Sequence, residues 1–239
     1  MEKPFSVTTY FQRHEQKYLL NAFQYHAFLE ILKGFAHHDE YGLSTIYSIY
    51  YDNSDFEIAR KALEKSAYKE KLRLRSYGIP HSGDMVYLEL KKKFNGLTYK
   101  QRVPVSFTGM KKCLDFRPDN TPHNYIFDEI NWFLYYYKPF PQFMISYDRV
   151  AFRGLEHKAL RITFDTNIRW RVGDLDFSKG PYGTPLLDDN EYLMELKIDT
   201  SLPLFLTTHL TRLKIFPLSF SKYRTAYEGL LNMRKVRYA

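Results

Sequence analysis

The chain has 239 residues, 44% of them hydrophobic and 18% aromatic, which suits one large all-β or α+β domain with a substantial core. Its net charge of +8 indicates an anionic partner, and its single cysteine excludes an internal disulfide framework and a multi-cysteine zinc site. The N-terminus lacks the apolar run of a signal peptide, and no stretch reaches the roughly 18 apolar residues of a membrane span. We therefore expect a single cytoplasmic domain over residues 1–239.

Alternating polar and apolar residues, separated by turn signals, predict a sheet of antiparallel strands. The strongest turn signal is the hairpin pair Asn95-Gly96. The expected strands, in chain order, are Thr8–Leu20, Leu43–Tyr51, Tyr68–Tyr77, Asp84–Lys93, Leu97–Phe107, Pro141–Phe152, Lys158–Thr166 and Glu191–Asp199.

Apolar residues at helical spacing predict helices between and after these strands. The adjacent histidines His37 and His38 would point apart, so we expect a loop there rather than a metal site. The segment 173–190, rich in Gly, Pro and Asp, is expected to be a long surface loop, with a mobile lid as the alternative. The expected helices are Asn21–Ala36, Phe56–Lys65, Asn124–Tyr137 and Ser219–Lys235.

One face of the strand expected at Tyr68–Tyr77 carries only cations. Side chains at i and i+2 of a strand point the same way, so Lys69, Lys71, Arg73 and Arg75 share a face that has no acidic residue. Such a row repels itself and favours a polyanion opposite it. The alternative is an ordinary solvated strand face.

The same one-sided charge recurs in the other expected strands, where a basic face with a few glutamates lies opposite an apolar face. Helices with apolar stripes can cover the apolar faces. The pattern therefore predicts an α+β fold: an antiparallel β-barrel tunnel with a charged, basic lumen, flanked by helices. The basic residues on these faces are Lys17, Arg73, Arg75, Lys91, Lys100, Arg102, Arg149 and Arg161, and Arg169 and Arg171 extend the set.

A cationic tunnel suits phosphate chains, because each phosphate offers several acceptor oxygens that arginine can bind in pairs. A bound polyphosphate also offsets the repulsion between cations that are packed closely in the empty site. The glutamates Glu15, Glu89 and Glu195 can hold a divalent metal that bridges phosphate oxygens. The alternative for each of them is a salt bridge to a neighbouring Lys or Arg.

Seven short motifs occur in the order seen in VTC domains, which the chain resembles over nearly its whole length. VTC domains are polyphosphate polymerase domains of the triphosphate tunnel, or CYTH-like, superfamily. The motifs are Arg13-x-Glu15-x-Lys17-Tyr18, Lys71-Leu72-Arg73-Leu74-Arg75, Leu88-Glu89-Leu90-Lys91, Tyr147-Asp148-Arg149-Val150-Ala151-Phe152, Leu160-Arg161-Ile162-Thr163-Phe164-Asp165-Thr166, Met194-Glu195-Leu196-Lys197 and Ser221-Lys222-Tyr223.

The resemblance implies a transferase that moves the γ-phosphoryl group of ATP to a growing inorganic polyphosphate chain and releases ADP. It also implies a divalent metal, Mn²⁺ or Mg²⁺, held by Glu195, with Glu15 and Glu89 as further candidate ligands. The implied phosphate-binding residues are Lys17, Arg73, Arg75, Lys91, Lys100, Arg102, Arg149, Arg161 and Lys222. All of these except Lys100 and Arg102 are also implied to be catalytic.

Two other functions stay open at this point. The first strand of hydrolytic tunnel enzymes carries a Glu-x-Glu-x-Lys motif, and this chain has Arg13 at the position of the first glutamate. Fewer acids favour holding a long anion over activating water, but a tunnel triphosphatase or polyphosphatase remains an alternative. A non-catalytic polyphosphate-binding module is the other. RNA binding would need exposed aromatics among the cations, and the alternation puts most aromatics opposite them, so no nucleic-acid partner is expected.

Overall fold

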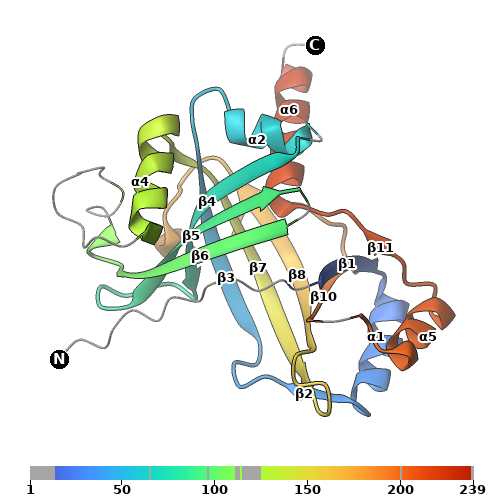
Figure 1. Cartoon of the computed structure of the whole chain (residues 1–239). Helices are drawn as coiled ribbons and strands as arrows, with labels where there is room; N and C mark the ends of the chain where they lie inside the picture. The colour runs from blue at the N-terminus through green and yellow to red at the C-terminus, as the bar shows by residue number, and fades with distance from the viewer. Residues whose placement is uncertain are drawn as a thin grey trace, which may run out of the picture.

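The computed structural model describes residues 14–64, 66–95, 97–110, 114, 125–199 and 201–237. Its centre is one antiparallel sheet that curls into a half-barrel with helices packed around it, which confirms the α+β fold expected from the sequence (Figure 1). The strand order is β11–β1–β10–β8–β7–β3–β4–β5–β6, and β2 and β9 pair with β7 and β8 outside this path.

The bounds of the elements lie close to those expected for the longer strands and helices. The strands are β1 His14–Leu20, β2 Ala36–His38, β3 Ser44–Asp52, β4 Tyr68–Tyr77, β5 Met85–Phe94, β6 Leu97–Ser106, β7 Phe140–Gly154, β8 Arg161–Arg171, β9 Thr184–Pro185, β10 Tyr192–Ile198 and β11 Pro217–Leu218. The helices are α1 Ala22–Leu32, α2 Glu57–Leu63, α4 Tyr125–Tyr137, α5 Leu204–Arg212 and α6 Lys222–Arg237, and Phe177–Lys179 forms the short 3₁₀ helix η1.

The curl of the sheet brings distant strands face to face. β10, β8, β7, β3 and β4 all lie between β1 and β5 in the sheet, yet Lys91 Nζ of β5 is 4.0 Å from Glu15 Oε2 of β1. The first turn of α6 enters the same concave side, because Lys71 Nζ of β4 lies 2.9 Å from Ser221 Oγ. We call this concave side the lumen.

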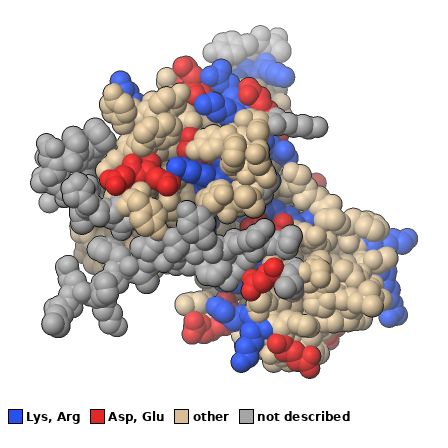
Figure 2. Space-filling model, viewed as in Figure 1, with Lys and Arg blue, Asp and Glu red and all other residues tan. Residues whose placement is uncertain are grey.

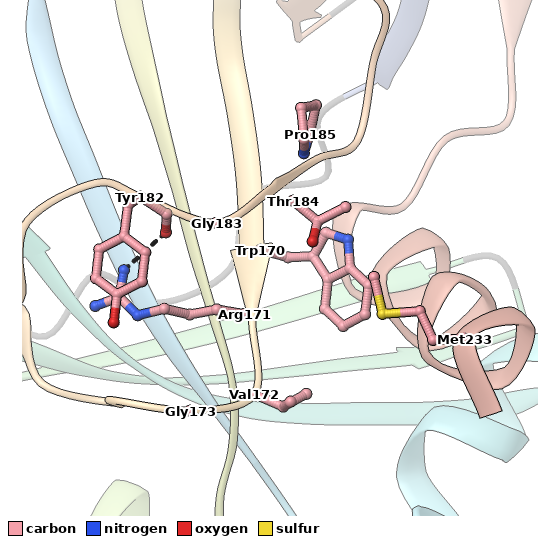
Figure 3. A pocket seen from close by; sticks show the side chains of 9 residues that line it. All are labelled: Trp170, Arg171, Val172, Gly173, Tyr182, Gly183, Thr184, Pro185 and Met233. Carbon is pink, nitrogen blue, oxygen red and sulfur yellow. Dashed lines mark hydrogen bonds between the residues drawn. The ribbon is translucent and has the colours of Figure 1, made fainter. Parts of the chain in front are cut away.

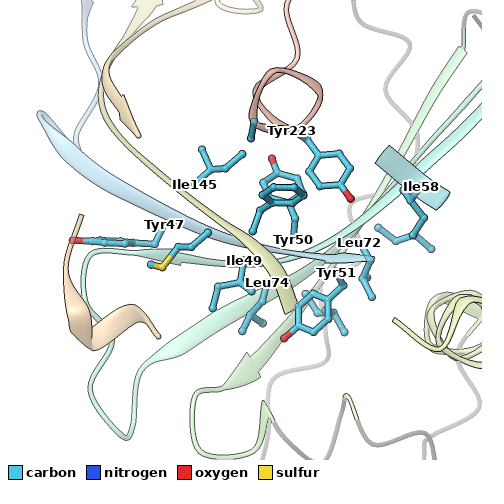
Figure 4. Close-up of a cluster of buried hydrophobic side chains, with 14 of the residues drawn as sticks. Tyr47, Ile49, Tyr50, Tyr51, Ile58, Leu72, Leu74, Ile145 and Tyr223 are labelled. Carbon is cyan, nitrogen blue, oxygen red and sulfur yellow. The ribbon is translucent and has the colours of Figure 1, made fainter. Parts of the chain in front are cut away.

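Two hydrophobic cores hold the half-barrel and the helices together. The larger core joins β3, β4, β5 and β7 to α2, α4 and α6, and it includes Leu72, Ile145 and Tyr223 (Figure 4). The smaller core joins β1, β8 and β10 to α1 and α5, with Phe28 and Phe164 fully buried. The apolar faces that the alternation predicts are the faces that build these cores, which leaves the charged faces of the strands for the lumen.

Four segments differ from the sequence prediction. A loop is expected at His37 and His38, but these residues belong to β2, where they pair with Arg153 and Phe152 of β7. The helix α5 and the two-residue strands β9 and β11 are not predicted, because segments this short and mixed give no clear period. The first strand is expected from Thr8, and residues 8–13 lie outside the described residues.

The segment 173–190 is tied to the sheet by one arginine. Arg171 of β8 is buried and donates hydrogen bonds to the carbonyl oxygens of Asp174, Asp176, Gly180 and Tyr182 at 2.8–3.1 Å. The surface loop expected here therefore carries regular structure, η1 and β9, and its backbone is fixed through a side chain.

A buried aspartate joins β3 to two helices. Asp52 is fully buried and accepts hydrogen bonds from the backbone N–H groups of Asn53, Ile58 and Ala59, which caps the start of α2. The hydroxyl of Tyr223 in α6 donates to the same carboxylate. Asp52 therefore fixes the position of α6, and with it the residues that α6 places in the lumen.

We predict that Asp52→Ala lowers the free energy of unfolding by about 2–4 kcal/mol, since three buried N–H groups and one hydroxyl lose their acceptor. Urea denaturation followed by circular dichroism measures this change. The matched control is Asp55→Ala, an exposed aspartate of the same turn, for which a change within about 0.5 kcal/mol is expected. Equal effects of the two substitutions would contradict the role given to Asp52.

Candidate functional site

A single buried carboxylate of β5 is surrounded by four cations. Glu89 is 1% exposed, and the antiparallel register places Arg73 of β4 and Arg102 of β6 directly beside it. We call this group the Glu89 cluster. Its shortest nitrogen–carboxylate distances are 2.7 Å for Arg73, 3.8 Å for Arg75, 2.9 Å for Lys100 and 2.5 Å for Arg102.

The four cations fix the charge state of Glu89. Burial alone would raise the pKa of this carboxyl, but the neighbouring arginines and Lys100 lower it well below its usual value. Glu89 is therefore ionised, and both of its oxygens accept short hydrogen bonds from arginines. This geometry favours the salt-bridge alternative for Glu89 over the role of metal ligand.

A second buried carboxylate organises the opposite side of the lumen. Asp165 of β8 is 1% exposed and accepts two hydrogen bonds from Arg149 of β7, at 2.5 and 2.7 Å, and one from Lys222 of α6, at 2.6 Å. Burial would raise the pKa of Asp165, and the two cations lower it. We call these three residues the Asp165 cluster.

Tyrosine side chains connect the two clusters. The ring of Tyr147 lies 4.4 Å from Lys222 Nζ and 5.1 Å from the guanidinium carbon of Arg149, within the range of cation–π attraction. Its hydroxyl accepts a hydrogen bond from Arg75 at 3.1 Å. Tyr50 holds Arg73 in the same way, at 2.9 Å. The sequence places Tyr147 in a motif with Arg149, but it does not predict the role of either tyrosine, because that role depends on contacts between separate strands.

Glu15 and Glu195 form an acidic pair on the adjacent strands β1 and β10. Lys197 Nζ lies 3.9 Å from Glu15 and 3.1 Å from Glu195, and Lys17 Nζ lies 3.3 Å from Glu15. Burial would raise the pKa of Glu195, but Lys197, a hydrogen bond shared with Glu15 and nearby Arg149 lower it well below its usual value. The pair is also within 4.0 Å of Lys91 and within 3.7 Å of Arg149, so four cations surround its two carboxylates.

The three glutamates expected to bind a metal do not come together. Among the described residues, no three His, Cys, Asp or Glu side chains are close enough to hold a metal ion. Glu15 and Glu195 contact each other, whereas Glu89 belongs to its own cluster of cations. Any metal held by the expected ligands would therefore rest on the pair Glu15 and Glu195.

Two lysines of the lumen face keep much of their surface accessible. Lys91 and Lys100 keep 43% and 41% of their side-chain surface accessible, yet burial is the largest cause that lowers the pKa of both amines. Solvent therefore still reaches both amines from the concave side, although neighbouring protein atoms disfavour their charged form.

Three arginines of the expected basic set lie apart from these clusters. Arg161 is paired with Asp39 at 3.2 Å and is 40% exposed. Arg169 and Arg171 do not extend the lumen set, because a bulge between β7 and β8 shifts the register at Ser146–Asp148 and reverses the alternation. Beyond the bulge Trp170 takes the inner position, and both arginines bind backbone carbonyls of the segment 173–190.

Residues 12–231 match the VTC domain family. The chain belongs to this family. No sequence match is found among curated proteins. The agreement covers the lumen clusters described above, since all of their residues fall within the matched range.

Two solved structures with the same fold are candidate adenylate cyclases. A candidate adenylate cyclase from Bacillus halodurans superposes with a TM-score of 0.53 at 13% identity, over 87% of this chain and 92% of that one. An adenylyl cyclase candidate from Hippeastrum, described as having a dominant triphosphatase activity, gives a TM-score of 0.53 at 14% identity, over 90% and 95% of the two chains. At these identities the likeness shows the fold of the VTC domain and nothing finer.

One cavity of the VTC domain lies away from the cation clusters. It has a volume of about 650 Å³ and is lined by residues of β8, the segment 173–185 and α6, among them Trp170, Arg171 and Met233 (Figure 3). Arg171 stacks on Tyr182 at 4.2 Å and has its N–H groups bound to carbonyl oxygens. The cavity therefore offers no free cation to a phosphate.

One face of the outer surface carries charges of both signs. On the face seen in Figure 2, described basic and acidic side chains are scattered among uncharged residues. One such exterior pair is Lys92 and Glu129, which joins β5 to α4 at 2.7 Å. No helix in the described part of the chain is long and apolar enough to cross a membrane.

We predict that Glu89→Gln lowers the free energy of unfolding by about 3–5 kcal/mol, because the Glu89 cluster then has four cations and no anion. Added polyphosphate of about 15 units should restore more stability to this variant than to the wild-type protein, since it supplies the missing charge. Urea unfolding with and without polyphosphate measures both effects.

The matched control for that experiment is Glu129→Gln, which breaks the exterior pair with Lys92 and should cost less than about 1 kcal/mol. If Glu89→Gln and Glu129→Gln behave alike in stability and in their response to polyphosphate, Glu89 does not organise the cluster.

Proposed function

We propose that this VTC domain is a polyphosphate polymerase, which transfers the γ-phosphoryl group of ATP to a growing polyphosphate chain and releases ADP. The observation that supports this function most strongly is the excess of cations over carboxylates in the lumen. Four cations share Glu89 and two share Asp165, so bound phosphates would supply the missing negative charge. We also propose that residues 1–239 form one domain and that the cytoplasm is its compartment.

The proposed roles follow the clusters. The arginines of the Glu89 cluster and of the Asp165 cluster bind phosphate oxygens through paired N–H groups, which positions donor and acceptor. Lys17 and Lys91, both close to Glu15, bind between phosphates as point charges. Arg161 lies apart from both clusters, and its side chain is 40% exposed. Positioning and charge neutralisation are the main requirements of phosphoryl transfer, so the protein needs no covalent chemistry for chain growth.

A divalent cation fits the acidic pair. Glu15 and Glu195 offer hard oxygen ligands, and Mg²⁺ or Mn²⁺ is commonly held by one or two carboxylates together with substrate phosphates. The hydroxyl of Thr163, which lies opposite Glu195 in the β8–β10 register, is buried without a hydrogen-bond partner among the described residues. When bound, the metal would neutralise phosphate charge during transfer.

Hydrolysis is the second candidate, because a fold neighbour is described as a triphosphatase. A hydrolase needs a carboxylate that is free to orient or deprotonate water. Glu89 and Asp165 are both held by cations at 2.5–2.9 Å, which makes them poor bases. This engagement of the buried acids favours the polymerase.

We expect purified protein incubated with ATP and Mn²⁺ to form polyphosphate and to release one ADP for each phosphoryl group added. Gel electrophoresis detects the polymer, and a coupled assay measures ADP. The control carries Arg73→Ala and Arg75→Ala, which removes two phosphate-binding side chains. Each lost charged hydrogen bond costs about 1.5–3 kcal/mol, so turnover should fall by at least about 10²-fold. Free phosphate as the only product would exclude the polymerase and establish a hydrolase.

We predict that Glu195→Gln abolishes most turnover while polyphosphate binding is largely kept, because the substitution removes a metal-ligand charge without removing a cation. Turnover is titrated against Mn²⁺, and binding is measured separately by calorimetry. The matched control is Glu191→Gln, a glutamate near the start of β10 that lies outside the acidic pair. An unchanged Mn²⁺ dependence in Glu195→Gln would remove Glu195 from the metal site.

A further inference from the structure

A serine and a lysine meet in the lumen at the first turn of α6. Ser221 Oγ lies 2.9 Å from Lys71 Nζ, although the two residues are 150 positions apart in the chain. Ser221 also receives a long hydrogen bond of 3.4 Å from the backbone N–H of Arg224, in the manner of a helix cap. Both side chains are half-buried, so the lumen still reaches them.

The charges with the largest effect on Lys71 are all positive. Lys69 and Arg73 flank it on β4, Lys91 faces it from β5 and Lys17 from β1. From α6 it meets the Ser221 hydroxyl and the ring of Tyr223, whose centroid is 5.3 Å away. Among the described residues Lys71 makes no ion pair with a carboxylate. Burial and the four cations lower its pKa to about 7, so much of this amine is a free base near neutral pH.

A neutral amine in hydrogen-bond contact with a hydroxyl is the arrangement that activates a serine as a nucleophile. Terminal phosphates of a growing chain are already anionic and need no base, whereas a serine hydroxyl does. Chain growth alone therefore gives the Lys71–Ser221 pair no role, whereas phosphoryl transfer to the serine would.

We propose that Ser221 is a phosphoryl acceptor, with Lys71 as the base that takes its proton. This inference rests on the proposed function, because ATP is the donor in both. Ser221 Oγ forms a bond to the γ-phosphorus, and the bond from that phosphorus to the β–γ bridging oxygen breaks. ADP leaves with the electron pair, and the hydroxyl proton moves to Lys71 Nζ.

The product would be stabilised where it forms. The new ammonium of Lys71 is already in contact with the Oγ atom that carries the phosphate. Backbone N–H groups at the start of α6, a helix of 16 residues, favour an anion at this position. A phosphoserine here would place a phosphate among the lumen cations, as a fixed starting point for a chain or as a covalent intermediate.

The experiment incubates the full chain with γ-³²P-ATP and Mn²⁺, removes free nucleotide and polyphosphate under denaturing conditions, and locates acid-stable label by mass spectrometry. ADP and polymer are measured in the same samples. We expect phosphate on Ser221, and its formation should rise with pH along a limb at or above about 7, because bound ATP raises the pKa of the Lys71 ammonium from its value in the free protein.

Variants separate the chemistry from folding. Ser221→Ala should abolish the label, and Ser221→Thr should keep it. Lys71→Arg keeps the positive charge but cannot accept a proton, so labelling should fall by about 10²-fold and lose its pH limb. The matched controls are Ser219→Ala, an exposed serine two residues earlier, and Lys69→Arg, a lysine of the same face whose Nζ binds the Ala62 carbonyl.

Label on Ser221 that depends on Lys71 supports the proposal. Absence of phosphate from Ser221 in the wild-type protein overturns it, and so does labelling that Lys71→Arg leaves unchanged. If ADP and polymer still form without the label, the polymerase stands and only the acceptor role fails. If neither ADP nor polymer forms, the proposed function fails as well.

Discussion

The structure depends on single buried carboxylates, each of which pairs with several of the cations crowded inside the half-barrel. Glu89 lies directly opposite Arg73, and Asp165 directly opposite Arg149, so the strand register itself brings opposite charges together. A slip of β5 by one residue would turn Glu89 outward and bury Leu88 and Leu90 among cations. Hydrophobic cores and charge pairing therefore specify the same register, and neither could change without the other.

Period-two alternation alone identifies the lumen face wherever a strand is unbroken. It places Glu89, Arg73 and Arg102 on that face before any contact is known, and the antiparallel register then joins them. It fails along β8, where the bulge opposite β7 and the left-handed backbone of Asn167, with φ of 50°, reverse the alternation. No local composition marks this bulge, which is why Arg169 and Arg171 are wrongly expected in the lumen.

Contacts between distant segments are the part of the site that a sequence pattern does not contain. The alternation puts Lys71 on the basic face but does not show which residues lie around it. Its burial comes from β1, β5 and α6, whose approach depends on the curl of the whole sheet and on Asp52 holding Tyr223. The same holds for the acids: their positions follow from the period, but the number of cations that reach each one does not.

The aromatic rings beside the cations bear on which anion the lumen suits. RNA and single-stranded DNA are bound by stacking bases on free aromatic faces. Here the Tyr147 ring is covered by Arg149 and Lys222, and Tyr50 stacks on Tyr223 with centroids 4.8 Å apart. These faces are already used to hold cations and α6 in place. These two tyrosines therefore leave no free aromatic face on which a base could stack, whereas the N–H groups of the lumen can bind phosphate. This favours an anion made of phosphates alone over a nucleic acid.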